Sequence, residues 1–145
     1  MRLVIDANSL VAELLQQRGR ALLRNPELEI YLAEQVRNEA EYKLRNRISR
    51  IVTLGRLSKA AGQEQFEAAL WIVNYQIRLV PAAFYNPLES EARKRIPRDS
   101  NDWSTVALAL ALPATIWTQD YDFFGCGCPT WTTETLTIQL SSDRS

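Results

Sequence analysis

The chain has 145 residues, with 17 basic side chains, 17 acidic side chains and no histidine. This length fits one domain with one hydrophobic core, so we expect a single domain over residues 1–145. Without histidine, neither a Ser-His-Asp nor a Cys-His active site can be built. Two cysteines are too few for a disulfide framework or a Cys/His zinc site. Acid–base or metal chemistry therefore falls to carboxylates.

The sequence shows no sign of membrane insertion or export. No apolar run reaches the ~20 residues that a membrane-spanning helix needs. The first residues lack the long apolar region and the cleavage site of a signal peptide. We therefore expect a cytoplasmic protein with no membrane segment.

The first half of the chain alternates strand-like and helix-like patterns. Residues 2–6 and 28–33 are apolar runs typical of buried strands. Between them, Asn8 or Ser9 can cap a helix that ends near residue 17, and a short segment follows at 21–24. Two long helices are then predicted at 35–54, where Gly55 supplies the stop, and at 58–74.

The second half continues this alternation. We expect a strand at 76–80, a short helix at 87–95, an apolar helix at 102–112, a strand at 114–118, one more strand within 131–140 with room for a turn of helix after it, and a flexible tail at 141–145. Strands that alternate with helices predict a parallel sheet covered by helices on both faces.

Acidic residues stand beside the most apolar runs. Asp6 ends the first strand, Asp102 precedes the apolar helix, and Asp120 follows the strand at 114–118. Buried strands deliver side chains to the crevice at their carboxyl ends, where ligands bind. Carboxylates gathered there would repel one another, and a divalent cation is the usual physical reason to tolerate that arrangement.

Each acid also has a structural explanation. Asp6 can cap a helix, and Asp99 or Asp102 can cap the apolar helix and complement its dipole. Either Asp120 or Asp122 can be a turn residue, and Asp120 is closer to the strand end. Asp102 is the stronger candidate of its pair because it directly adjoins the apolar helix.

Glu39 and the basic residues after it allow two interpretations. Glu39 can form an i,i+4 ion pair with Lys43 instead of reaching a pocket. Lys43, Arg47 and Arg50 share one helix face and can bind an RNA backbone, or they can form an ordinary solvated surface. The Gly-Cys-Gly-Cys-Pro run at 125–129 lacks the pattern of a dinucleotide loop and has too few thiols for a metal site, so we interpret it as a glycine-bearing loop.

Taken together, these segments resemble the PIN domain, and more narrowly the VapC-like toxin ribonucleases of bacteria. The resemblance rests on the segments 3–9, 99–102 and 118–123, with Glu39 on the helix after the second strand, and covers residues 2 to about 132. It implies an α/β fold of three layers, helix–sheet–helix, with a central parallel sheet of about five strands.

The resemblance also implies a function. The chain would be a Mg²⁺- or Mn²⁺-dependent endoribonuclease and the toxin of a toxin–antitoxin pair, with RNA, a cognate antitoxin and a second copy of itself as partners. By position, the acidic quartet would be Asp6, Glu39, Asp102 and Asp120. The metal ligands would be Asp6, Asp102 and Asp120, with Asp99 as an additional acid, and Thr118 or Asn8 would help to hold the pocket.

Two alternatives remain open at this stage. A haloacid-dehalogenase-like phosphatase also begins with an apolar strand that ends in an acidic motif, and it needs a lysine that Lys94 can supply. A non-catalytic RNA-binding module with the PIN-like fold is the other alternative. Such a module has no use for carboxylates that face phosphate.

Overall fold

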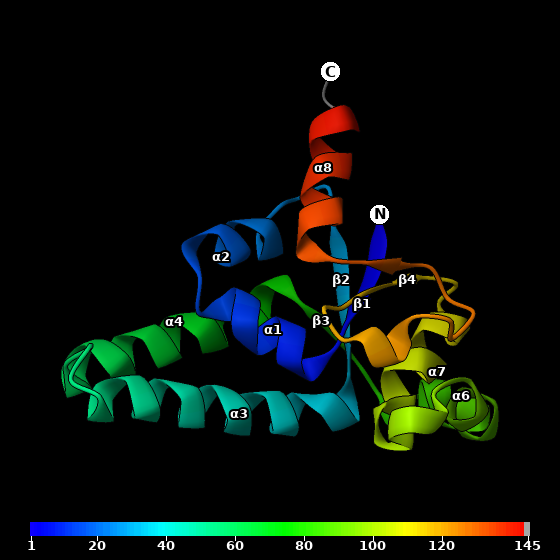
Figure 1. Cartoon of the computed structure of the whole chain (residues 1–145), viewed down its shortest axis with the longest axis horizontal. Helices are drawn as coiled ribbons and strands as arrows, with labels where there is room; N and C mark the ends of the chain where they lie inside the picture. Colours follow the sequence, from blue (N-terminus) through cyan, green and yellow to red (C-terminus); the bar gives the residue numbers. More distant parts are fainter. Residues whose placement is uncertain (144–145) are drawn as a thin grey trace.

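The structure, a computed structural model, describes residues 1–143 and has a five-stranded parallel sheet at its centre (Figure 1). The strands are β1 (Arg2–Ile5), β2 (Glu29–Ala33), β3 (Arg78–Val80), β4 (Thr115–Trp117) and β5 (Thr130–Trp131), and their order in the sheet is β3-β2-β1-β4-β5. Every pairing is parallel, with Val4 of β1 opposite Tyr31 of β2 and Ile116 of β4. The predicted parallel sheet of about five strands is confirmed.

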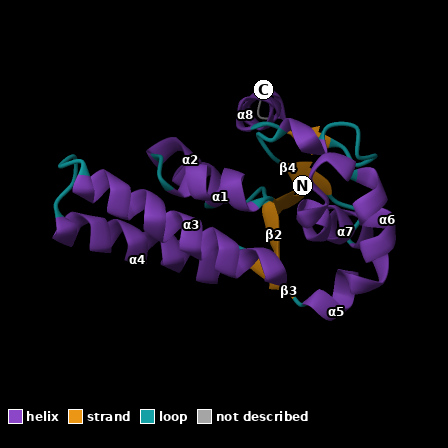
Figure 2. Ribbon diagram, turned by 60° about the horizontal axis from the view of Figure 1, so that its bottom comes forward, coloured by secondary structure: helices purple, strands orange, loops and turns teal. Residues whose placement is uncertain are grey.

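Helices cover both faces of the sheet (Figure 2). They are α1 (Ala7–Leu14), α2 (Gln17–Leu23), α3 (Glu34–Thr53), α4 (Lys59–Gln76), α5 (Ala82–Tyr85), α6 (Glu89–Arg95), α7 (Trp103–Ala111) and α8 (Thr133–Asp143), with the short 3-10 turns η1 (Asn86–Leu88), η2 (Pro97–Asp102) and η3 (Tyr121–Phe123). Helices α1 to α4 lie on one side of the sheet, and α6 and α7 lie on the other. The three predicted layers are therefore present.

The core forms where the central strands meet α1 and α7. Leu3, Val4 and Ile5 of β1 are fully buried, because a strand in a parallel sheet with helices on both faces has no solvated side. Helix α7 is buried from Trp103 through Ala109, as expected of a helix that is apolar all round. No helix among the described residues is long and apolar enough to cross a membrane.

Helices α3 and α4 form a long hairpin that extends away from the sheet (Figure 1). Helix α3 buries Val36, Ala40, Leu44 and Ile48, which recur every four residues along one face. It ends as predicted at Gly55, whose φ of 75° is the left-handed conformation that favours glycine at a helix C-terminus. The N–H of Arg56 donates to the carbonyl of Ile51 at 3.2 Å and completes this stop.

The predicted last strand within 131–140 is present, but it is much shorter than expected. Only Thr130 and Trp131 form β5, and residues 133–143 form α8, which buries Thr133, Leu136 and Leu140 on one face. The alternation of apolar and polar residues predicted a longer strand, but the spacing of these three buried residues is helical. The tail predicted at 141–145 is wrong at 141–143, which belong to α8, while residues 144–145 lie outside the described part of the chain.

Candidate functional site

The carboxyl edge of the sheet brings together acids that are far apart in the sequence. Asp6 directly follows β1, and Asp120 comes three residues after the end of β4. Because β1 and β4 are parallel neighbours, both strands end at the same edge. Asp102 stands at the start of α7, and Glu39 lies in the second turn of α3, which follows β2 directly.

Asp6 is the most deeply buried of these acids. Its exposed fraction is 4%, and its Oδ1 atom has no hydrogen-bond partner among the described residues. Burial raises the pKa of this carboxyl, the hydroxyls of Ser9 and Thr118 lower it, and the charge of Asp120 raises it again. A buried carboxylate with an unpaired oxygen is costly unless a cation compensates it.

The residues predicted to cap the first helix do not cap it. Asp6 occupies the N-cap position of α1, Asn8 and Ser9 lie inside the first turn, and no side chain makes the capping hydrogen bond. Instead, Ser9 Oγ accepts the backbone N–H of Gln119 at 3.0 Å, and Asn8 Oδ1 accepts from Lys43 Nζ at 2.8 Å. Both side chains therefore join α1 to other parts of the site.

The pKa of Asp102 shows that the other acids lie near its carboxyl group. Its pKa is raised to about 7, first by burial and then by the charges of Asp99, Asp6, Asp120 and Glu39. Each of these acids therefore lies close enough to Asp102 to oppose its ionisation. The structure brings the predicted quartet and Asp99 to one place, while their roles as ligands remain predictions.

Backbone hydrogen bonds hold Asp120 in its turn. Its N–H donates to the fully buried Thr118 Oγ1 at 2.9 Å, and its Oδ1 accepts the N–H of Asp122 at 2.9 Å. The charge of Asp120 acts on both Asp6 and Asp102, whereas that of Asp122 is not among the causes of either shift. The preference for Asp120 over Asp122 therefore agrees with the electrostatics.

A buried network that the sequence interpretation missed supports this turn from behind. Thr133 Oγ1 accepts from Trp117 Nε1 at 3.0 Å and donates to Oε1 of Glu13, which is 4% exposed, at 2.8 Å. The N–H of Thr133 donates to Gln119 Oε1 at 2.7 Å. The sequence did contain a signal for this network. Glu13 lies seven residues after Asp6, so on a helix it falls on the same buried face, where a charged side chain needs a partner.

Glu39 lies at the rim of the site. Its Oε1 is paired with Lys43 Nζ at 2.8 Å, so the predicted i,i+4 ion pair is present. The same ammonium group donates to Asn8, which links α3 to the first turn of α1. Glu39 nevertheless contributes to the raised pKa of Asp102, so it remains within electrostatic reach of the other acids.

The acids fit a hard divalent cation. Such ions prefer oxygen ligands, and both the unpaired Asp6 oxygen and the repulsion at Asp102 would be relieved by a positive charge. Within residues 1–143, no group of three or more histidine, cysteine, aspartate or glutamate side chains could hold a metal ion by itself. Mg²⁺ keeps several waters and needs only one or two carboxylates together with substrate phosphates, so the donors present suit it.

A basic hollow adjoins the acids. It has a volume of about 350 Å³ and is lined by Asn8, Val11, Lys43, Asn46, Arg47 and Arg50. Lys43, Arg47 and Arg50 thus share one surface, as their spacing predicted.

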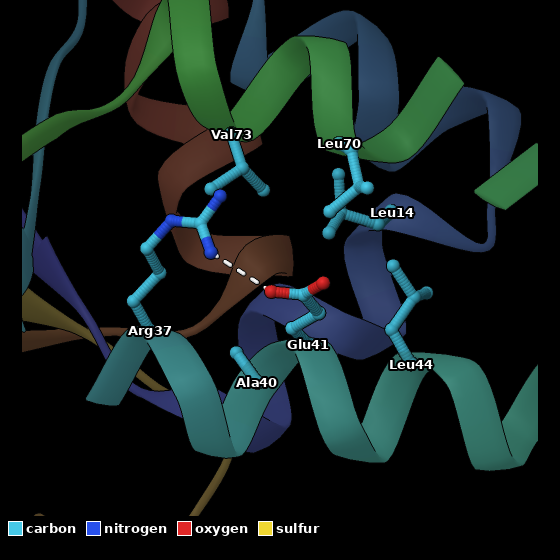
Figure 3. A pocket seen from close by; sticks show the side chains of 7 residues that line it. All are labelled: Leu14, Arg37, Ala40, Glu41, Leu44, Leu70 and Val73. Carbon is cyan, nitrogen blue, oxygen red and sulfur yellow. Dashed lines mark hydrogen bonds and ion pairs between the residues drawn. The ribbon is translucent and has the colours of Figure 1, made fainter. Parts of the chain in front are cut away.

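A second hollow, between α1, α3 and α4, is a small cavity of about 10 Å³ bordered by the 2.9 Å ion pair of Arg37 and Glu41 (Figure 3). It has room for one water at most.

Comparisons with known proteins agree with this architecture. The family model described as PIN domain matches residues 4–141. Among solved structures, PAE2754 from Pyrobaculum aerophilum is 17% identical, with a TM-score of 0.67 and coverage of 98% of this chain and 96% of that chain. VapBC2 from Rickettsia felis is 16% identical (TM-score 0.58; 91% and 98% covered), and FitAcB from Neisseria gonorrhoeae is 20% identical (TM-score 0.54; 89% and 96% covered). No curated protein matches the sequence significantly.

The raised pKa of Asp102 predicts a pH-dependent stability. Its carboxyl titrates near 7 in the folded chain and near 3.8 in the unfolded chain, so the folded state binds more protons between these values and the free energy of unfolding falls as pH rises through them. Asp102→Asn should therefore gain about 1–2 kcal/mol over the parent at pH 8, after a discount for partial exposure, and lose most of this gain near pH 4.

Urea denaturation in EDTA at the two pH values measures this difference. Asp143→Asn, on the exposed end of α8, is the matched control and should show no such dependence. An equal gain for Asp102→Asn at both pH values would mean that repulsion among the acids is not its cause.

The Thr133 network makes a second prediction. Thr133→Val keeps the shape but removes both hydrogen bonds of the hydroxyl, which leaves Trp117 Nε1 and the buried Glu13 carboxyl without their partner. We expect a loss of about 1–3 kcal/mol in the free energy of unfolding. Thr133→Ser keeps the hydroxyl and should lose no more than about 0.8 kcal/mol for its missing methyl group. Urea denaturation of both variants tests this order, and a valine variant as stable as the serine variant would contradict it.

Proposed function

Since the chain belongs to the PIN domain family, we propose that it is a metal-dependent endoribonuclease that acts in the cytoplasm as the toxin of a toxin–antitoxin pair. PIN domains are generally nucleases. The observation that carries the proposal for this chain is the buried Asp6 carboxylate with its unpaired oxygen, which lies among other acids at the carboxyl edge of the sheet. A cation that also contacts RNA phosphate would compensate this charge.

The residues of the site divide the proposed chemistry among them. A bound Mg²⁺ or Mn²⁺ would supply charge for the scissile phosphate and would acidify a water. Asp6, Asp102 and Asp120 would hold the cation, with Asp99 beside Asp102 as an additional acid. Thr118 fixes Asp120 through the 2.9 Å bond to its N–H.

Glu39 would complete the site from the side of α3. Release of Glu39 from its pair with Lys43 would free a carboxylate to orient the attacking water or to join the metal ligands. The same movement would free the Lys43 ammonium group, which can then contact phosphate.

The hollow lined by Lys43, Arg47 and Arg50 would hold the RNA backbone. It borders the acids directly, since Lys43 Nζ contacts both Asn8 and Glu39 at 2.8 Å. A net charge of zero gives little long-range attraction for RNA, so binding would depend on this local surface.

The proposed protein partners follow from the structural neighbours. VapBC2 and FitAcB are toxin–antitoxin complexes, and the former was solved with a DNA fragment from its promoter. By analogy we propose a cognate antitoxin and a homodimer for this chain. Co-expression with the product of the neighbouring reading frame, followed by size-exclusion chromatography, tests both.

Membership of the PIN domain family removes the phosphatase alternative. In addition, Lys94 is exposed on α6 and is not among the groups that shift the pKa of Asp6 or Asp102. The non-catalytic RNA-binding module is the competing function. It predicts RNA binding that is unaffected by loss of the acids and no metal-dependent cleavage.

Asp6→Asn and Asp102→Asn test the catalytic proposal. Each variant removes one negative charge from the site with little change in size. RNA cleavage in Mn²⁺ should fall at least about 100-fold, because each 1.4 kcal/mol of lost charge stabilisation corresponds to a factor of ten in rate. Thermal melting in EDTA should show a fold at least as stable as the parent, since repulsion among the acids is reduced.

Asp143→Asn controls for the loss of a charge elsewhere and should cleave at the parent rate. Parent-like cleavage by Asp6→Asn or Asp102→Asn would remove that residue from the site. A parent protein that binds RNA but shows no cleavage, with equal midpoints in EDTA and Mn²⁺, would favour the non-catalytic module.

A triple substitution of Lys43, Arg47 and Arg50 to glutamate tests the RNA surface. The salt dependence of single-stranded RNA binding should weaken by roughly 0.7 in logarithmic slope for each lost phosphate contact. Fluorescence anisotropy over a salt series measures this slope. The control replaces the exposed Arg56, Lys59 and Lys94 by glutamate and has the same net charge. If both variants change the slope equally, total charge and not this surface controls binding.

A further inference from the structure

A tight turn between η3 and β5 places two thiols together. Gly125 has a φ of 86° and Gly127 a φ of 89°, so the chain bends at both glycines around Cys126. A Cβ at residue 127 would also meet Nη1 of Arg95, so the end of this arginine side chain would have to move. Cys126 and Cys128 are both free.

The two cysteines differ in exposure but lie within reach of each other. The Cys126 side chain is buried, with an exposed fraction of 1%, whereas Cys128 is partly exposed and lines an open hollow of about 330 Å³ together with Gly127 and Pro129. Cys126 Sγ lies 3.9 Å from the carbonyl oxygen of Cys128, and the two thiols can hydrogen-bond to each other. Residues two apart are at most about 7 Å apart between Cα atoms, and the bends shorten this towards the range of a disulfide.

The surroundings favour a negative charge on the buried sulfur. The hydrogen bond from Cys128 is the main cause that lowers the pKa of Cys126 to about 6, against burial, and the guanidinium of Arg95 lowers it further. The same hydrogen bond, together with burial and the charge of Cys126, raises the pKa of Cys128 far above its usual value, so the Cys128 sulfur holds the proton that the two thiols share. Arg95 is fixed at this place because its Nη1 donates to the carbonyl oxygen of Cys126 at 3.2 Å and its Nε pairs with Glu91 at 3.0 Å. Thiolates, not thiols, attack disulfides.

We propose that Cys126 and Cys128 are a redox-active thiol pair that closes to an intramolecular disulfide by exchange with a small-molecule disulfide of the glutathione class. The Cys126 thiolate accepts the proton of Cys128 through the hydrogen bond between them, and the exposed Cys128 thiolate attacks the incoming disulfide, forms a mixed disulfide and releases one small thiolate. Cys126 then passes this proton to the released thiolate, attacks the Cys128 sulfur and expels the second small thiolate, which takes its proton from water. The small disulfide gains two electrons and the protein loses two.

This pair is independent of the proposed nuclease function, since neither cysteine is an assigned ligand of the acidic site. It also assigns separate tasks to the two residues. Cys128 is the entry thiol because it borders the open hollow, and Cys126 is the resolving thiol because it is buried beside Arg95.

The experiment exposes the fully reduced chain to oxidised glutathione at pH 7, blocks the remaining thiols with iodoacetamide and measures intact mass over time. The parent should end with both thiols lost and no adduct. Cys126→Ser should keep a stable glutathione adduct at Cys128. Cys128→Ser should react at least roughly tenfold more slowly, because its remaining thiol is buried. In Arg95→Gln the adduct should accumulate before it resolves.

Circular dichroism before oxidation checks that each variant is folded. A parent that retains both thiols, or that ends with a stable adduct while Cys126→Ser also forms one, overturns the proposal. A Cys128→Ser variant that reacts as fast as Cys126→Ser overturns the assignment of Cys128 as the entry thiol.

Discussion

The burial of the Asp6 carboxylate at the end of the central strand is the constraint on which the rest of the site depends. One of its oxygens has no partner within the described chain, and its charge faces those of other acids. Such an arrangement disfavours folding unless neighbouring groups compensate it. Ser9 and Thr118 supply part of that compensation, and the raised pKa of Asp102 shows that part of the repulsion remains. A cation would remove the remaining repulsion. The repulsion that opposes folding and the proposed metal binding therefore have the same origin, the group of carboxylates.

Helix α1 connects Asp6 to the turn that carries Asp120. Asp6, Ser9 and Glu13 follow one another at helical spacing along the side of α1 that faces β4 and α8. Ser9 holds the backbone after β4, and Glu13 anchors the start of α8 through Thr133. Since Thr133 and Ser9 both bind Gln119, the residue before Asp120 is fixed from two sides. A rigid turn of this kind holds the backbone of Asp120, and the N–H of Asp122 holds its carboxylate.

At the site, an acidic group and a basic group of side chains lie next to each other, although the charges of the whole chain cancel. The acids gather at the sheet edge, and the basic side chains of α3 border them across Lys43. This arrangement would suit the proposed cation and the proposed RNA backbone side by side. The ion pair of Lys43 with Glu39 therefore has a role in the proposed function as well as in the fold. Its carboxylate lies on the side of the proposed cation, and its ammonium group lies on the side of the proposed RNA backbone.

The sequence by itself determined the parallel sheet, the helices around it and the chain positions of the acids. Apolar runs are read reliably as buried strands, and the carboxyl ends of parallel strands must share an edge, so Asp6 and Asp120 could be placed together without coordinates. The end of the long helix at Gly55 was also predictable, because a positive φ is local chemistry.

Only the tertiary structure decided the features that depend on distant partners. The threonine-rich segment after β5 is a helix because Thr133, Leu136 and Leu140 find a buried face there, which alternation of polar and apolar residues does not reveal. Asn8 and Ser9 do not cap their own helix, because their side-chain oxygens accept hydrogen bonds from distant residues. The partner of Asn8 is Lys43, 35 residues away, and the partner of Ser9 is Gln119, 110 residues away. Periodicity reports the face that a residue occupies, whereas the identity of its partner is set by packing between elements far apart in the chain.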